Sequence, residues 1–143
     1  MAEMVAVAAD HGGYELKSVL LPELRALGFD VLDLGTNSPE SVDYPDFAEK
    51  VAAAIETGKA RFGVLICGTG IGMSIAANRH RKVRAALCHD VTSARLARQH
   101  NDANVLTLGG RLIGTEAAKD CLKTFLSTSF EGGRHARRVA KLS

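Results

Sequence analysis

Tryptophan is absent from this chain of 143 residues, and aromatic residues make up only 5% of it. Proteins that bind single-stranded nucleic acid stack bases on such rings, so this class of function is not expected. The formal net charge of +2 is also too small to indicate an electrostatic surface for nucleic acid. No apolar run is long enough to span a membrane, and the N-terminus carries no signal-peptide pattern. We therefore expect no nucleic-acid partner and no membrane insertion.

Cysteine is also scarce, with only Cys67, Cys88 and Cys121 in the chain. An odd count argues against a disulfide framework, and the three thiols lack the spacing of a zinc site. No other cluster of histidine, cysteine and carboxylate residues has the spacing of metal ligands. These absences predict a cytoplasmic protein that holds no metal.

The remaining composition is ordinary for a globular protein, with 46% hydrophobic and 24% charged residues. The length suits one domain with a substantial core. The sequence contains no internal repeat, no low-complexity segment and no change of composition that would mark a boundary. We expect residues 1–143 to form a single domain.

The apolar pattern alternates between short strands and amphipathic helices. Strand character is found at residues 4–9, 31–34, 64–66, 83–88 and 105–108. Helical patterns run over residues 14–27, 45–57, 74–78, 91–99 and 115–126. Pro22 predicts a kink or a break in the first helix, and Thr115 is the expected N-cap of the last. This alternation predicts an α/β fold whose parallel sheet is covered by helices on both faces.

The segment richest in chemistry follows the third predicted strand. Cys67 ends that strand, and Gly68, Gly70 and Gly72 alternate with larger residues before a helix that we expect from Ser74. A strand, a glycine loop and a helix together direct free backbone N–H groups at an anion. The same amides and the helix dipole favour the thiolate of a cysteine placed there.

Two familiar cofactor sites fit this loop poorly. It lacks the two-residue gap of a dinucleotide fingerprint, and it lacks the Gly-Lys-Ser/Thr ending of a P-loop. We therefore expect no nucleotide cofactor. A tight strand-to-helix turn without function is equally consistent with the loop alone.

Other polar residues follow the predicted strands at the edge where parallel sheets bind their ligands. Asp10 and His11 follow the first strand, His89 and Asp90 follow the fourth, and Arg111 follows the fifth. We interpret Asp10 and His11 as functional, although a loop pair without function has the same pattern. For His89 a role in shaping its loop alone is the alternative to a functional role.

Further basic residues occur near the ends of helical segments. Arg134 and Arg138 are four residues apart, so on a helix they share one face and suit a phosphate dianion. A solvated basic tail is the alternative. His100 ends a helix, whose C-terminus also favours an imidazolium without any catalytic role. We interpret the basic run at 79–82 as a solvated helix end.

Six motifs run through the chain in order: Asp-His-Gly-Gly at 10–13, Asp-Tyr-Pro at 43–45, Ile-Cys-Gly-Thr-Gly-Ile-Gly at 66–72, Ser-Ile-Ala-Ala-Asn at 74–78, Arg-Gln-His-Asn-Asp at 98–102 and Gly-Gly-Arg-His at 132–135. With these motifs the whole chain resembles the type B ribose-5-phosphate isomerase family, which includes allose- and galactose-6-phosphate isomerases. The resemblance implies a three-layer α/β/α sandwich with a Rossmann-like, five-stranded parallel sheet of order 2-1-3-5-4. It also implies a homodimer with active sites shared between subunits, in some members paired into tetramers.

The resemblance further implies an aldose–ketose isomerase of the pentose phosphate pathway, acting on a phosphorylated sugar. Members interconvert D-ribose 5-phosphate and D-ribulose 5-phosphate through a cis-enediolate, without a metal or cofactor. One branch of the family uses a cysteine at position 67 as base, and the other uses a glutamate at position 73. Cys67 and Met73 place this chain with the cysteine branch.

By the same resemblance, Cys67 moves the proton between C2 and C1. Asp10 and His100 open the sugar ring, and Asn101 positions the sugar. Thr69 and a set of loop amides hold the enediolate oxygens, namely those of Gly68, Thr69, Gly70, Ile71 and Gly72. The remaining hydroxyls and the phosphate are surrounded by His11, Arg111, Arg134 and Arg138.

Two alternatives stay open. A 6-phosphohexose isomerase would need a larger pocket, which sequence spacing does not measure. A non-catalytic sugar-phosphate sensor would need the arginines and the glycine loop but neither Cys67 nor His100. The presence of both residues favours an enzyme.

Overall fold

Five parallel strands form one sheet in the computed structural model, which describes residues 2–143. The strands are β1 (Met4–Ala9), β2 (Asp30–Asp33), β3 (Phe62–Cys67), β4 (Ala85–Leu87) and β5 (Val105–Gly109). They lie in the order β2-β1-β3-β5-β4, and every neighbouring pair is parallel. This confirms the α/β class and the strand order implied by the resemblance.

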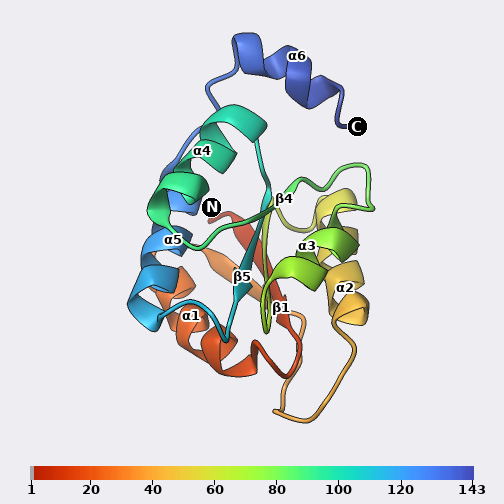
Figure 1. Ribbon diagram of the computed structural model, residues 1–143, viewed down its shortest axis with the longest axis vertical. Helices are drawn as coiled ribbons and strands as arrows, with labels where there is room; N and C mark the ends of the chain where they lie inside the picture. The colour runs from red at the N-terminus through yellow and green to blue at the C-terminus, as the bar shows by residue number, and fades with distance from the viewer. Residues whose placement is uncertain (1) are drawn as a thin grey trace.

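Helices cover both faces of the sheet, as Figure 1 shows. The helices are α1 (Tyr14–Ala26), α2 (Tyr44–Glu56), α3 (Ile71–Ala77), α4 (Val91–Asn101), α5 (Thr115–Ser127) and α6 (Arg134–Ala140). Helices α1, α4 and α5 pack on one face, and α2 and α3 pack on the other. Among residues 2–143, no helix has the length and apolar character needed to cross a membrane.

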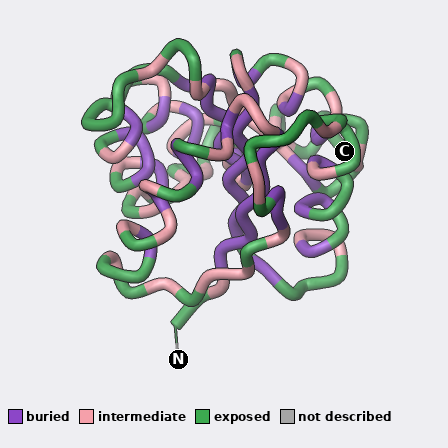
Figure 2. The backbone as a smooth tube through the Cα atoms, turned by 90° about the horizontal axis from the view of Figure 1, so that it is seen from below, coloured by how far each residue is buried: buried purple, intermediate pink, exposed green. Residues whose placement is uncertain are grey.

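The three central strands are buried on both faces because each face meets its own layer of helices. Side chains alternate along a strand. In β3, Ile66 therefore joins the apolar cluster under α1, α4 and α5, whereas Leu65 and Cys67 face the layer of α2 and α3. Edge strands β2 and β4 are only partly buried. Figure 2 shows the buried strands between helices whose outer sides are exposed.

Two features of the helix boundaries differ from the predictions. Helix α1 continues through Pro22, so the break that was one of the two predicted outcomes does not occur, because Leu16, Leu20 and Leu24 are buried against the sheet and hold the two halves of the helix on one surface. The N-cap of α5 is Gly114, whose ψ of 155° is extended, and Thr115 is already helical.

The fourth strand and the C-terminal segment also differ from the predicted pattern. Strand β4 covers only Ala85–Leu87, since the backbone N–H of Arg84 donates to the Asn104 side chain at 2.8 Å rather than extending the ladder. The basic tail forms α6, with Arg134 at its first position and Arg138 one turn later.

The basic run at 79–82 contains one residue that is not a solvated helix end. His80 places its Nε2 2.8 Å from Glu49 Oε1 and its Nδ1 3.1 Å from Glu56 Oε1, so it joins the end of α3 to α2. The hydrogen bond to Glu49 is the main cause that raises the pKa of His80, and the charges of both carboxylates add to it against the opposing effect of burial.

This contact predicts a stability that depends on pH. A histidine with a raised folded-state pKa stabilises the fold fully below its unfolded pKa of about 6.5, and the effect is lost as pH rises through the folded pKa. We expect His80→Gln to lower the free energy of unfolding by about 0.2–1 kcal/mol at low pH and by less at high pH. Urea unfolding of both proteins at about pH 6 and about pH 9 measures the difference. A difference that is the same at both pH values would contradict this prediction.

Candidate active site

A cleft of about 420 Å³ opens at the carboxyl ends of the central strands. It lies where the topology of a parallel sheet predicts a ligand site. Its lining residues are Asp10, Tyr44, Cys67, Gly68, Thr69, Ile71, Gly72, Ile75 and Arg111. Seven of the predicted site residues, Arg111 included, therefore line one cleft, and the segment 67–72 contributes most of its wall.

The glycine loop is shorter than predicted, because α3 begins at Ile71 rather than Ser74. Gly70 is the N-cap and has a φ of 77°, a left-handed conformation that favours glycine. Gly72 lies in the first helical turn, where an added Cβ would meet the Tyr44 ring at 2.5 Å. The expected helix at 74–78 is thus the second half of α3.

Cys67 lines this cleft at the end of β3. The residue is 5% exposed, and its Sγ accepts a hydrogen bond from the backbone N–H of Gly70 at 3.2 Å. Thr69 Oγ1 accepts from the N–H of Ile71, also at 3.2 Å. The glycine loop therefore fixes the position of the sulfur in the cleft.

The N–H groups that were expected to bind the enediolate oxygens fall into two sets, those that already donate to a side chain of the loop and those that do not. The N–H groups of Gly70 and Ile71 are engaged by side chains of the loop itself. Those of Gly68, Thr69 and Gly72 donate to no protein acceptor among residues 2–143. The second group is therefore free to bind an oxyanion.

Asp10 lies at the end of β1, on the neighbouring side of the cleft. Its Oδ1 accepts hydrogen bonds from the N–H groups of Gly12 at 2.9 Å and Gly13 at 3.2 Å, and only 7% of the residue is exposed. Gly13 is required because a Cβ there would overlap the carbonyl of Ile66 in β3. The sequence thus folds into a turn that holds a carboxylate in the cleft with Cys67.

His11 and Arg111 have different positions relative to this cleft. His11 Nδ1 accepts from the N–H of Val42 at 3.2 Å, so the ring fastens the loop between β2 and α2 and does not line the cleft. Arg111 is exposed and lines the cleft, with its side chain against Gly68. Its backbone N–H donates to the Gly68 carbonyl at 3.0 Å, which ties the loop after β5 to the glycine loop.

The remaining predicted residues lie at the opposite edge of the sheet. Helix α4 starts at the carboxyl end of β4 and returns to the amino edge, where His100 and Asn101 end it before β5 begins. Cys67 pairs with the last residue of β5, so five residues of strand, about 16 Å, separate the two edges. Helix α6 lies beyond the end of α4 and carries Arg134 and Arg138 (Figure 1). One chain therefore does not bring these four residues to Cys67.

Charged side chains, of which Arg98 is buried, hold the end of α4 in place. The side chain of Arg98 is 3% exposed, and its Nη1 donates to Asp102 Oδ1 at 2.9 Å and to the Ala103 carbonyl at 2.6 Å. Arg84 Nε donates to the Asp102 carbonyl at 2.8 Å. Asp102 itself has a φ of 47° and closes the helix. These bonds fix the turn that presents His100 and Asn101.

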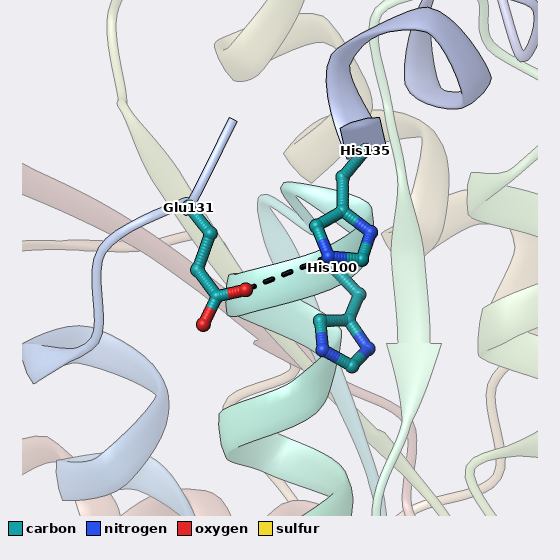
Figure 3. A group of neighbouring side chains, drawn as sticks. All are labelled: His100, Glu131 and His135. Carbon is teal, nitrogen blue, oxygen red and sulfur yellow. Dashed lines mark ion pairs between the residues drawn. The ribbon is translucent and has the colours of Figure 1, made fainter. Parts of the chain in front are cut away.

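Two residues that sequence reasoning did not assign surround His100, as Figure 3 shows. The His100 ring stacks on that of His135, with centroids 4.3 Å apart and planes at 15°. Glu131 Oε1 lies 3.5 Å from His135 Nε2. Burial and, next, the charge of His100 lower the pKa of His135, and the neighbouring arginines add to this effect. Sequence spacing did not reveal this cluster because α4 and the segment before α6 meet only in the fold.

The cleft also contains side chains to which the sequence analysis gave no role. Tyr44 lies in the Asp-Tyr-Pro motif, and its ring packs on Gly72 beside the glycine loop. Ile71 and Ile75 of α3 are half or more exposed at the cleft. For Ile71 the resemblance predicted a role of the backbone N–H only, not of the side chain.

Three further positions have structural roles. Met73 is fully buried in the core under α3, so no carboxylate enters the cleft from that position. Asp90 caps α4 by accepting from the N–H of Ser93 at 2.7 Å, and this bond lowers the pKa of Asp90. His89 is exposed at the same turn and does not line the cleft.

Comparison with known proteins gives consistent results. A family model described as Ribose/Galactose Isomerase matches residues 5–142. Ribose-5-phosphate isomerase B of Escherichia coli is 45% identical over 139 residues, which cover 97% of this chain and 93% of that protein.

Solved structures agree with the sequence comparison. A ribose 5-phosphate isomerase from Thermotoga maritima superimposes with a TM-score of 0.96 at 55% identity, covering 99% of this chain and 98% of its own. A type B ribose 5-phosphate isomerase from Trypanosoma brucei gives a TM-score of 0.97 at 45% identity, over 99% of this chain and 97% of that one.

Proposed function

This chain belongs to the Ribose/Galactose Isomerase family, and from that premise we propose that it interconverts D-ribose 5-phosphate and D-ribulose 5-phosphate. The observation that carries the proposal is the Cys67 thiol, held by the Gly70 N–H in a cleft that also contains Asp10. The three cysteines form no disulfide, which supports the proposal that the protein functions in the reducing cytoplasm.

The chemistry of the cleft suits proton transfer next to a carbonyl. Cys67 takes the proton from C2 of the open aldose, the electrons move to the carbonyl oxygen at C1, and a cis-enediolate forms. The proton of the C2 hydroxyl passes to the neighbouring oxygen on C1, the same sulfur returns its proton to C1, and the ketone forms at C2. Such a step needs one positioned base and donors aimed at the developing oxyanion. The free amides of Gly68, Thr69 and Gly72 supply those donors.

A second copy of the chain completes the site in this proposal. The cleft is rimmed by apolar side chains that remain exposed in one chain: Tyr44 at 39%, Ile71 at 50% and Ile75 at 61%. Exposed apolar side chains grouped around a functional cleft favour burial against a partner. We propose a homodimer in which the partner brings its His100 and Asn101 to this cleft, together with its two α6 arginines.

In this dimer the phosphate is held by Arg134 and Arg138, with Arg111 beside the glycine loop. One charge-assisted contact to an anion contributes about 1.5–3 kcal/mol. We expect Arg134→Ala and Arg138→Ala each to raise the KM for ribose 5-phosphate by about 10- to 100-fold. Steady-state kinetics with the phosphorylated sugar measures this change.

Unphosphorylated ribose is the matched control for these variants, because it lacks the group that the arginines hold. Activity on ribose should change little in Arg134→Ala and Arg138→Ala. Equal losses with both sugars would mean that the arginines support the fold of α6 and do not recognise phosphate.

A coupled assay tests the proposed function directly. We expect kcat/KM to be larger for ribose 5-phosphate than for allose 6-phosphate. The opposite order would favour a 6-phosphohexose isomerase. Binding of both sugars without turnover would favour a sensor and would overturn the enzymatic proposal.

A further inference from the structure

Three side chains of metal-ligating type meet at the amino edge of the sheet: His100 from α4, Glu131 from the segment before α6, and His135 from α6 (Figure 3). We propose that they form a binding site for a transition-metal cation of the zinc type. We also propose that metal bound there inhibits the isomerase, because the site includes His100.

The geometry is close to that of a metal site. One ligand atom from each residue lies within 4.8 Å of the others. Bonds from zinc to nitrogen and oxygen of about 2.0–2.2 Å require tetrahedral ligand atoms about 3.3 Å apart. The atoms therefore need to approach one another by up to about 1.5 Å, which rotation of side chains can supply. Glu131 is half exposed, so its carboxylate is free to turn inward and the site is open to solvent.

The backbone places these residues together before any metal binds. The N–H of Glu131 donates to the carbonyl of Gln99 at 3.0 Å, next to His100. Gly132 and Gly133 both have positive φ, 68° and 54°, and turn the chain so that α6 starts against α4. The stack of His135 on His100 completes the contact. Because an imidazole lone pair lies in the plane of its ring, binding one metal requires the two rings to tilt out of this stack, while the backbone stays in place.

The donor set also suits this class of metal. Two imidazoles and one carboxylate leave a fourth position for water, an arrangement typical of zinc. The charges of Arg134 and Arg138 beside His135 repel a cation, and the Glu131 carboxylate offsets them.

Inhibition is the part of this inference that rests on the proposed function. In that function His100 moves a proton to open the sugar ring. A metal bound to the imidazole removes the lone pair that accepts the proton and holds the ring against α6. Turnover of ribose 5-phosphate should then fall while the fold is retained.

Calorimetric titration with zinc chloride alone, in a buffer that does not bind zinc, tests the site. We expect one zinc per chain in the wild type and in Cys67→Ser, a variant that removes the only thiol in the cleft. Glu131→Gln and His135→Phe should weaken binding by about tenfold or more. Phenylalanine keeps a ring in the stack, and thermal unfolding confirms that each variant is folded.

His89→Phe, which removes an exposed histidine elsewhere, should bind zinc as the wild type does. Zinc binding that is absent in the wild type, lost in Cys67→Ser, or unchanged in both Glu131→Gln and His135→Phe would overturn the site.

Rates measured with added zinc separate the site from the function. We expect zinc to inhibit the wild type, a chelator to restore the rate, and Glu131→Gln to need about tenfold more zinc for the same inhibition. Zinc that binds through Glu131 and His135 without slowing turnover would leave the metal site supported. It would contradict both the inhibition and the ring-opening role of His100. Activity that vanishes with the chelator and returns with zinc would overturn inhibition and the metal-free mechanism.

Discussion

Replacing Cys67 with alanine is expected to lower kcat by about 10²- to 10⁴-fold, the range that a positioned base contributes, and so to abolish useful turnover. Two groups in the cleft accept an N–H of the glycine loop and have a proton of their own, the Cys67 thiol and the Thr69 hydroxyl. Of the two, a thiol gives up its proton far more readily than an alkyl hydroxyl, so the thiol is the base in this proposal. Substrate affinity should be nearly unchanged, because the phosphate and hydroxyl contacts belong to other residues. Steady-state kinetics and calorimetric binding of ribose 5-phosphate measure the two quantities.

The other two cysteines provide matched controls. Cys88 and Cys121 are buried in the apolar cluster on the other face of the sheet. Burial is the main cause that raises the pKa of both thiols, that of Cys121 to about 11, so they are inert at neutral pH. Cys88→Ala and Cys121→Ala should keep the wild-type kcat and lose only stability. A Cys67→Ala variant with the kcat of the wild type would rule out this cysteine as the base.

The His100→Ala variant should lose about 10²- to 10⁴-fold in the conversion of ribose 5-phosphate, yet keep the enediolate step. Ribose 5-phosphate is mostly a closed furanose, whereas ribulose 5-phosphate cannot close through its phosphorylated C5 oxygen. Ring opening needs a proton acceptor and a proton donor, and histidine serves either role near neutral pH. Enediolate formation from the open ketose needs only the Cys67 side of the site.

Solvent exchange separates these two steps. Comparing the two directions does not, because the equilibrium constant ties their kcat/KM values together for any variant. Incorporation of deuterium from D2O at C1 of ribulose 5-phosphate reports enediolate formation without ring closure. We expect near wild-type exchange in His100→Ala and none in Cys67→Ala. Exchange that is lost in both variants would mean that His100 acts on the enediolate or on binding.

Much of the fold follows from the sequence. The strand at Met4–Ala9 has the predicted bounds, and the alternation of strands with helices is sufficient for a covered parallel sheet. Local signals failed where tertiary contacts decide. The burial of three leucines carries α1 through Pro22, and the left-handed Gly70 lets α3 begin three residues earlier than its helical pattern suggests.

The cleft was predictable from topology, since Asp10, the glycine loop and Arg111 each follow a strand and share the carboxyl edge. The same reasoning places His100 elsewhere, because a helix that follows β4 must return to the amino edge before β5. Local sequence patterns do not reveal contacts between segments that are far apart in the chain. The stack of His100 on His135 and the packing of Tyr44 on Gly72 come from the fold alone.

The most direct test of a site built from two chains is a mixture of two inactive variants. In a dimer of Cys67→Ala with His100→Ala, one site combines the intact Cys67 of one chain with the intact His100 of the other. Random pairing of equal amounts makes half of the dimers mixed, each with one working site of two, so about a quarter of the wild-type activity should return. The two variants are mixed by co-refolding, and recovery is measured with ribose 5-phosphate. A mixture that contains mixed dimers and stays as inactive as its parts would contradict the shared site.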